Sequence, residues 1–233
     1  MRFERGPPVL ASVALDAAQK VAGLNLKPDD APSAQLDTYA PKTRLSLPFA
    51  GEWTAWNAAR SAANPHYVNP NQRFAVDWVK TDKDKKTHQN KGEKNEDYFC
   101  YGADMLSPAD GVVVSIVDGV PDNAPQKEMD VYNVIGNSLV IDLGNGEFAL
   151  FAHAIPGSFA VAVGAKVRRG QRLARVGNSG NSSEPHLHFQ LMNAPRLFRA
   201  QSLPAKFADV MVDGTKRALA WPDQGERVKP IGP

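Results

Sequence analysis

The pattern of apolar and polar positions changes near Leu45. Beyond that point, short runs of β-branched, aromatic and other apolar residues alternate with clusters of Gly, Pro, Asn and Asp, which is typical of an all-β protein. Asn145-Gly146 stands between two such runs and predicts a tight β-hairpin. The expected strands cover residues 74–80, 111–117, 138–143, 147–153, 172–176 and 186–192. We therefore expect a mainly β fold.

The two ends of the chain differ from this central part. Residues 23–43 contain three prolines among polar residues, which predicts an extended linker. Apolar residues before it recur at helical spacing and predict a short amphipathic helix; they are Leu10, Val13, Ala14, Ala17, Ala18 and Val21. The expected organisation is an N-terminal helix and linker over 1–44, a core domain over 45–195 and a C-terminal extension packed on that core over 196–233, with one strand near 206–212.

Composition narrows the classes of function. The 233 residues are 42% hydrophobic and 22% charged, which is typical of a globular domain with a real core. The 27 basic residues nearly balance the 25 acidic ones, so bulk charge does not favour a nucleic-acid partner. Cys100 is the single cysteine, which excludes an internal disulfide and a Cys-x-x-Cys zinc site. No stretch approaches the roughly 20 apolar residues that span a bilayer, and the N-terminus shows no clear signal peptide.

Residues 80–94 form a charged segment without apolar residues. Six lysines are interspersed with Asp82, Asp84 and Glu93. Mixed signs favour a solvated loop over a patch that binds a polyanion.

The candidate chemistry lies in the histidines, which number five. His186 and His188 fall on an expected strand at positions i and i+2, so their rings share one face about 7 Å apart. A loop of small residues, 177–183, precedes the pair and lets backbone approach a bound substrate. His153 ends another expected strand, and Asp77 interrupts an apolar one, where a buried carboxylate needs a cation. Three imidazoles and a carboxylate are the ligand and acid–base set of a hydrolytic zinc site.

Four segments, in this order and at this spacing, carry a family resemblance. They are Ser107-Pro108-Ala109-Asp110-Gly111-Val112-Val113, Gly164-Ala165-Lys166-Val167-Arg168-Arg169-Gly170-Gln171, Gly177-Asn178-Ser179-Gly180 and His186-Leu187-His188-Phe189. Over residues 45–193 the chain resembles the lysostaphin-type (LytM-like) zinc metallopeptidase family. The resemblance implies an antiparallel β-sheet with a groove across it and substrates drawn from the peptide stems and bridges of peptidoglycan. It also implies a periplasmic or extracellular location.

The resemblance assigns roles to individual residues. Asp77 and His188 match the family's carboxylate and histidine ligands of one zinc ion. His153 and His186 match two histidines that flank the metal, polarise its water and stabilise the oxyanion. Substrate contacts are expected from the small-residue loop, at Asn178, Ser179 and Asn181.

One position departs from the family pattern. The first ligand is a histidine four residues before the aspartate, and here that residue is Arg73, which has no lone pair to give a metal. Two alternatives follow. Arg73 leans toward the vacant position and supplies positive charge in place of zinc, or His66 folds back over the intervening loop and completes the site as third ligand.

These alternatives correspond to two functions. The first is an active zinc endopeptidase that cleaves peptidoglycan peptides. The second is a degenerate, metal-free module that binds peptidoglycan or regulates a partner hydrolase. The presence of Asp77, His153, His186 and His188 favours the first, because a binding module has no chemical need for all four, whereas Arg73 favours the second.

Overall fold

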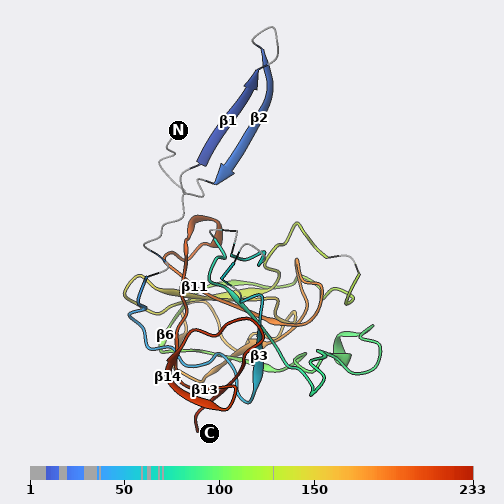
Figure 1. Ribbon diagram of the computed structural model, residues 1–233, viewed down its shortest axis with the longest axis vertical. Helices are drawn as coiled ribbons and strands as arrows, with labels where there is room; N and C mark the ends of the chain where they lie inside the picture. The colour runs from blue at the N-terminus through green and yellow to red at the C-terminus, as the bar shows by residue number, and fades with distance from the viewer. Residues whose placement is uncertain are drawn as a thin grey trace.

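The computed structural model describes residues 9–15, 20–28, 36, 38–58, 60–61, 64–67, 69, 71–127 and 129–232. Over these residues the fold is mainly antiparallel β, as the sequence predicted (Figure 1). The strands are β1 (Val9–Leu15), β2 (Val21–Pro28), β3 (Trp53–Trp56), β4 (Val76–Val79), β5 (Asp104–Leu106), β6 (Gly111–Val117), β7 (Ser138–Asp142), β8 (Phe148–Ala152), β9 (Lys166–Val167), β10 (Arg172–Arg175), β11 (Leu187–Met192), β12 (Ser202–Leu203), β13 (Phe207–Val212), β14 (Thr215–Ala220) and β15 (Arg227–Pro230). Two short 3-10 helices, η1 (Asn95–Asp97) and η2 (Leu197–Arg199), complete the described elements.

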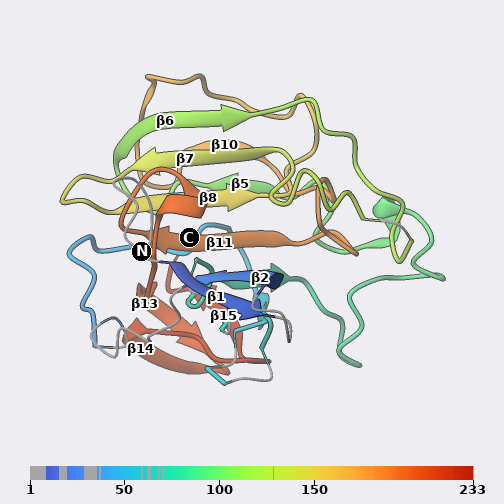
Figure 2. The ribbon, with the colours of Figure 1, turned by 90° about the horizontal axis from the view of Figure 1, so that it is seen from above.

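One large sheet dominates the fold. Its strand order is β14-β13-β15-β3-β4-β11-β8-β7-β6-β9, with β12 paired to β11. Figure 2 shows β6, β7, β8 and β11 following one another across this sheet. Strands β5 and β10 form a separate antiparallel pair. The centre of the large sheet therefore joins β4 to β11, the two strands that carry Asp77 and His188.

The hairpin between β7 and β8 forms where the sequence predicted it. Leu143 and Glu147 close the loop through a backbone hydrogen bond of 2.9 Å. Asn145 and Gly146 both have positive φ, 56° and 77°, as a type I′ turn requires at its two central residues. This turn fixes the pairing register that places His153 directly after β8.

The helix expected near the N-terminus is wrong for the residues that the structure describes. Val9–Leu15 and Val21–Pro28 pair as antiparallel strands; Ala17 and Ala18 lie outside the described residues. β-branched residues such as Val9 and Val13 lose side-chain freedom in a helix, and a partner strand offers the backbone a complete hydrogen-bond ladder. The hydrogen bonds and packing of this strand pair therefore outweigh the helical preference suggested by the spacing of apolar residues.

The C-terminal segment continues the main sheet. Beyond residue 200, β13, β14 and β15 extend the sheet, and β15 pairs with β3 through Arg227–Thr54 and Val228–Trp53. The strand expected near 206–212 is β13. The edge of β3 that faces away from β4 is therefore covered by β15.

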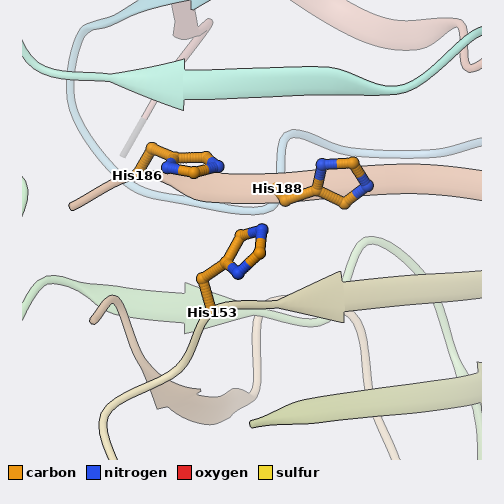
Figure 3. A group of neighbouring side chains, drawn as sticks. All are labelled: His153, His186 and His188. Atoms are coloured by element: carbon orange, nitrogen blue, oxygen red, sulfur yellow. The ribbon is translucent and has the colours of Figure 1, made fainter. Parts of the chain in front are cut away.

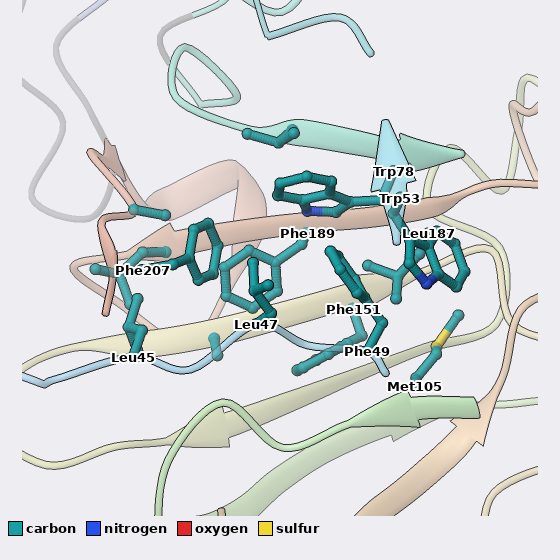
Figure 4. Packing of buried hydrophobic residues seen from close by; sticks show 14 of the residues in the cluster. Leu45, Leu47, Phe49, Trp53, Trp78, Met105, Phe151, Leu187, Phe189 and Phe207 are labelled. Carbon is teal, nitrogen blue, oxygen red and sulfur yellow. The ribbon is translucent and has the colours of Figure 1, made fainter. Parts of the chain in front are cut away.

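The core lies on one face of the sheet (Figure 4). Phe49 packs against Trp53 and Trp78 with ring centroids 4.9 Å away in each case, and Phe189 contacts Phe151 and Phe207 at 5.3 and 5.5 Å. Cys100 is buried among these apolar residues, and burial raises the pKa of its thiol to about 12. The thiol is therefore protonated and packs as a small apolar group. Among the described residues, none of the helices has the length and apolar character of a membrane span.

Candidate metal and catalytic site

Two neighbouring strands bring Asp77 and His188 together. In the ladder between β4 and β11, His188 is the direct partner of Asp77. Along β11, Leu187 and Phe189 point into the core, so His188 points to the opposite face. Nδ1 of His188 lies 2.8 Å from Oδ1 of Asp77, and both side chains are buried. The alternation along β11 sets the face on which His188 lies, and the ladder between β4 and β11 brings that face to Asp77.

His66 joins this pair from a turn between β3 and β4. Its Nε2 lies 3.6 Å from Oδ2 of Asp77, and its ring meets that of His188 edge to face with centroids 5.1 Å apart. Its side chain is 12% exposed. Of the two alternatives left by the sequence, the structure has His66 reaching the carboxylate.

Arg73 does not approach the carboxylate. It lies in a turn before β4. Its guanidinium carbon stands 5.2 Å from the ring centroid of Tyr67, the residue after His66. Among the described residues, no ion pair joins Arg73 to Asp77.

His153 and His186 form the second half of the histidine cluster (Figure 3). Their ring centroids are 4.7 Å apart, and the ring of His153 is 5.7 Å from that of His188. Nε2 of His186 lies 3.5 Å from Oδ1 of Asp77. His153 has φ of 62°, an uncommon value for a residue with a side chain, and this backbone turn at the end of β8 directs its ring toward the other two.

The small-residue loop supports the cluster from behind. The backbone oxygen of Ser179 accepts a hydrogen bond of 2.7 Å from Nδ1 of His153, and the carbonyl of Glu184 lies 2.8 Å from Nδ1 of His186. Asn178 and Ser179 are fully buried, and their side chains bond within the protein to Ser182 Oγ and to the backbone of Ala154. Asn181 is exposed. Of the three residues expected to contact substrate, only Asn181 is open to solvent.

Burial and mutual contact set the protonation of the site. Burial by itself would raise the pKa of Asp77, but the imidazoles of His66 and His186 and the hydrogen bond with His188 hold that pKa well below its usual range. Burial, then the neighbouring His186 and His188, lowers the pKa of His153 well below 6.5. Burial also lowers the pKa of His66. The site therefore combines an ionised Asp77 with neutral rings at His66 and His153, and an ionised carboxylate and a neutral imidazole are what a metal requires of such ligands.

The donor set fits a zinc ion. One potential ligand atom from each of His66, Asp77 and His188 lies within 4.8 Å of the others, and the same holds for His153, His186 and His188. Atoms that bind one tetrahedral zinc at about 2.0–2.2 Å stand roughly 3.3 Å apart. Nδ1 of His188 lies 2.8 Å from Oδ1 of Asp77 and Nε2 of His66 lies 3.6 Å from Oδ2, so the two imidazoles face different oxygens of the carboxylate, at separations on either side of that value. Two nitrogens and one carboxylate oxygen also leave a fourth position open, as in catalytic zinc sites.

Two neighbours of the site were not found from the sequence. Oε1 of the buried Gln190 lies 3.3 Å from Nε2 of His188, so Gln190 can orient this ring through the nitrogen that does not face Asp77. The amide of Asn57 donates to Oδ2 of Asp77 at 2.8 Å. Gln190 follows His186 and His188 at every second position, so strand alternation could have predicted that it lies on the same face. No sequence pattern near Asn57 predicted its contact with Asp77.

A pocket of about 280 Å³ opens beside the cluster. Its lining includes Asp77, His186, Asn57, Glu184 and Trp56. Burial raises the pKa of Glu184, whose carboxylate also accepts a hydrogen bond from Thr87. The carboxylate of Asp77 and the ring of His186 are therefore reachable from solvent through this pocket.

Residues 94–200 match the model of Peptidase family M23, which confirms the predicted resemblance to lysostaphin-type peptidases. The matched segment includes His153, His186 and His188, whereas His66 and Asp77 lie before it.

Solved structures of peptidases are also similar to the chain. A zinc-containing peptidase from Vibrio cholerae shares 18% sequence identity, with a TM-score of 0.39, over 83% of this chain and 45% of that chain. The catalytic domain of the antimicrobial peptidase lysostaphin from Staphylococcus simulans shares 21% identity, with a TM-score of 0.36, over 72% of this chain and 91% of that one. The chain spans less than half the length of the Vibrio structure and, at 47%, of a structure from Pseudomonas aeruginosa.

Proposed function

Because residues 94–200 match peptidase family M23, we propose that the protein is a zinc-dependent endopeptidase that hydrolyses peptide bonds in the stems or cross-bridges of peptidoglycan. The observation that carries the proposal is the convergence of His66, Asp77 and His188 on one point beside an open pocket. A metal-free module would have no need to gather the imidazoles of His66, His186 and His188 around one carboxylate. The site of action is then the periplasm or the cell exterior, where peptidoglycan is found.

His66, Asp77 and His188 would hold the zinc ion. When bound there, zinc supplies a Lewis acid that polarises the scissile carbonyl and lowers the pKa of water. His66 takes the role of the histidine that Arg73 replaces. Gln190 and Asn57 orient His188 and Asp77 through their hydrogen bonds, as the groups around metal ligands commonly do.

His153 and His186 would handle the proton and the developing charge. Nδ1 of His153 donates to the carbonyl of Ser179, so its lone pair is at Nε2. Because burial keeps this ring neutral, Nε2 is suited to accept a proton from the attacking water. Nδ1 of His186 donates to the carbonyl of Glu184, so its Nε2 also carries a lone pair and faces the site. Nε2 would donate to the carbonyl oxygen, as negative charge develops, only once the ring has taken up a proton.

The metal content of the purified protein tests this proposal. After removal of loosely bound metal and incubation with one equivalent of zinc, elemental analysis should find about one zinc per chain. Asp77→Ala and His66→Ala should each lose that zinc. His88→Ala is the matched control, because His88 lies outside the cluster and contacts Tyr98 instead, with ring centroids 5.1 Å apart.

Digestion of purified peptidoglycan completes the test. Zinc-loaded protein should release new amino termini from the polymer, and the Asp77→Ala and His66→Ala variants should not. Zinc retained by His66→Ala would remove His66 from the ligand set. Absence of zinc from wild-type protein would overturn the peptidase proposal and favour a metal-free binding module.

A further inference from the structure

We infer that a second pocket, on the far side of Trp56 from the histidine cluster, binds a carboxylate carried by the substrate peptide. This inference deepens the proposed function and rests on it for the identity of the substrate. The pocket has a volume of about 330 Å³. It is lined by Thr54, Trp56, Thr81, Asp82, Lys83, Lys85, Asp213, Gly225 and Arg227.

Trp56 connects the two pockets. It lines both the pocket beside Asp77 and His186 and this second pocket. In the ladder between β3 and β4, Trp56 is the direct partner of Asp77, so the indole stands one strand away from the proposed metal ligand. Its side chain is 39% exposed, whereas Trp53 and Trp78 are buried. A peptide that crosses the cluster can therefore lie over Trp56 and continue into the second pocket.

Two of the three cationic groups of the second pocket are without an ion pair among the described residues. Lys83 and Lys85 are exposed, and neither forms an ion pair with another described residue. Arg227 is held near the pocket by Glu52, at 3.7 Å, and keeps 59% of its side chain exposed. The three cations outnumber the two carboxylates at this opening, Asp82 and Asp213, and so attract an anion, although each exposed pair contributes only a modest amount of binding free energy.

The two carboxylates of the pocket already have hydrogen-bond partners. Oδ1 of Asp82 accepts from the backbone N–H groups of Asp84 and Lys86, at 2.8 and 2.9 Å, and so shapes the turn that presents the lysines. Oδ1 of Asp213 accepts from the backbone N–H of Arg227 at 3.0 Å. Both carboxylates therefore stabilise the walls, and neither pairs with Lys83 or Lys85.

Hydroxyl groups form the floor between these charges. Thr54 and Thr81 lie 2.9 Å apart, Oγ1 to Oγ1, and one of the two hydroxyls remains able to donate to a ligand. The lining residues of the pocket include no histidine or cysteine. All of its lining residues lie outside the segment that matches the peptidase family, 94–200. It is built by β3, the charged loop and the C-terminal strands of this chain.

The shape and charge of the pocket select a substrate class. Lysine and arginine side chains on a polar floor suit a carboxylate at or near the end of a short peptide branch, whereas a bridge made only of neutral residues would leave the cations without a partner. We therefore expect a peptide with a free carboxylate close to the cleaved bond.

Binding to Trp56 tests the inference directly. The chain has four tryptophans, so ¹⁵N-indole NMR of the full-length protein gives few signals, and Trp56→Phe identifies the one from Trp56. The probes are the end-blocked pentapeptide Ala-Ala-Glu-Ala-Ala, the same peptide with Gln in place of Glu, and Ala-Ala-Gln-Ala-Ala with a free carboxyl terminus. The Gln peptide with blocked ends carries no carboxylate, and the other two distinguish a side-chain carboxylate from a terminal one. Mass spectrometry checks that the peptides stay intact.

At least one carboxylate peptide should shift the Trp56 signal and bind about fivefold more tightly than the neutral peptide, with weaker binding at 0.5 M salt. The double variant Lys83→Gln/Lys85→Gln should remove this preference. The matched control Lys86→Gln/Lys91→Gln changes two exposed lysines of the same loop that do not line the pocket and should keep it.

Equal binding of neutral and carboxylate peptides, no movement of the Trp56 signal, or equal loss in both double variants would overturn the inference. Failure of the proposed function is seen separately, as a wild-type protein that holds no zinc and releases no amino termini from peptidoglycan. If the protein holds zinc and digests peptidoglycan but shows no preference for carboxylate peptides, the inference about the second pocket is wrong and the proposed peptidase function still stands.

Discussion

The guanidinium of Arg73 lies over the ring of Tyr67, with its central carbon 5.2 Å from the ring centroid. Tyr67 follows His66, whose Nε2 lies 3.6 Å from Asp77. The residue found where a family histidine is expected therefore packs on the turn that supplies a different histidine. Arg73 is in this reading a positioning residue for His66.

Arg73→Ala should weaken zinc binding without removing a ligand. A cation–π contact of this kind contributes about 0.5–1 kcal/mol, so the zinc dissociation constant should rise about two- to fivefold. Competition with a chromophoric chelator measures the change. Arg172→Ala is the control, because Arg172 is an exposed residue of β10. Equal zinc affinity in wild type and Arg73→Ala would show that the turn holds His66 without this contact.

Gln190→Leu should weaken zinc binding more strongly. Gln190 is fully buried and its Oε1 lies 3.3 Å from Nε2 of His188, so its loss leaves that ring without its orienting partner. Removal of such a partner commonly costs about 10- to 100-fold in metal affinity. The same chelator competition measures it, with the exposed Gln201→Leu as control. If the two variants bind zinc equally well, Gln190 serves packing alone.

The metal-free protein should lose stability on mild acidification. Burial, and then His186 and His188, lowers the pKa of His153 well below 6.5 in the folded state. Below about pH 6.5 the unfolded chain binds a proton at this residue that the folded chain does not, so the free energy of unfolding decreases as pH falls. The loss from His153 between pH 7.5 and 5.5 should be roughly 1 kcal/mol.

Urea unfolding in the presence of a chelator measures this pH dependence. His153→Gln removes the titrating group and should give a shallower loss between pH 7.5 and 5.5. Asp77 contributes in a different range: its pKa is lowered in the fold, so its stabilisation is present above its usual value of 3.8 and is lost as pH falls below that. Parallel pH profiles for wild type and His153→Gln would contradict the assignment to His153.

Gly180→Ala should destabilise the protein far more than Gly164→Ala. Both glycines have positive φ, 82° and 87°, so each substitution places a side chain in left-handed backbone at a cost of about 1–2 kcal/mol. A Cβ at Gly180 would also lie 2.4 Å from the backbone nitrogen of Gly136, whereas nothing lies within 4 Å at Gly164. The clash would displace Ser179, which holds His153.

Chemical unfolding of the two glycine variants isolates the effect of the clash. The difference between them should exceed about 1 kcal/mol, in the range of overpacking costs. Equal destabilisation of the two variants would mean that the loop over 177–183 shifts to relieve the clash without lowering the free energy of unfolding.

Local pattern was enough to determine the central strands of the main sheet, β4, β11, β8, β7 and β6, and the face of β11 on which His188 lies. Alternation along β11 places His188 opposite Leu187 and Phe189, and the turn at Asn145-Gly146 follows from the positive φ that these residues tolerate. These features depend on residues two or three apart, so sequence periodicity reports them directly. The N-terminal strands were mistaken for a helix because their stabilising partner is another segment, which periodicity within one segment does not reveal.

Contacts between distant segments were decided only by the tertiary structure. The sequence left open whether Arg73 or His66 would reach Asp77, because the path of a loop depends on what it packs against. Likewise, Arg227 reaches the pocket beside Trp56 only because β15 pairs with β3, where Arg227 is the partner of Thr54, 173 positions earlier in the chain. Strand pairing of this kind is favoured by long-range burial and hydrogen bonding, and no local pattern of residues encodes it.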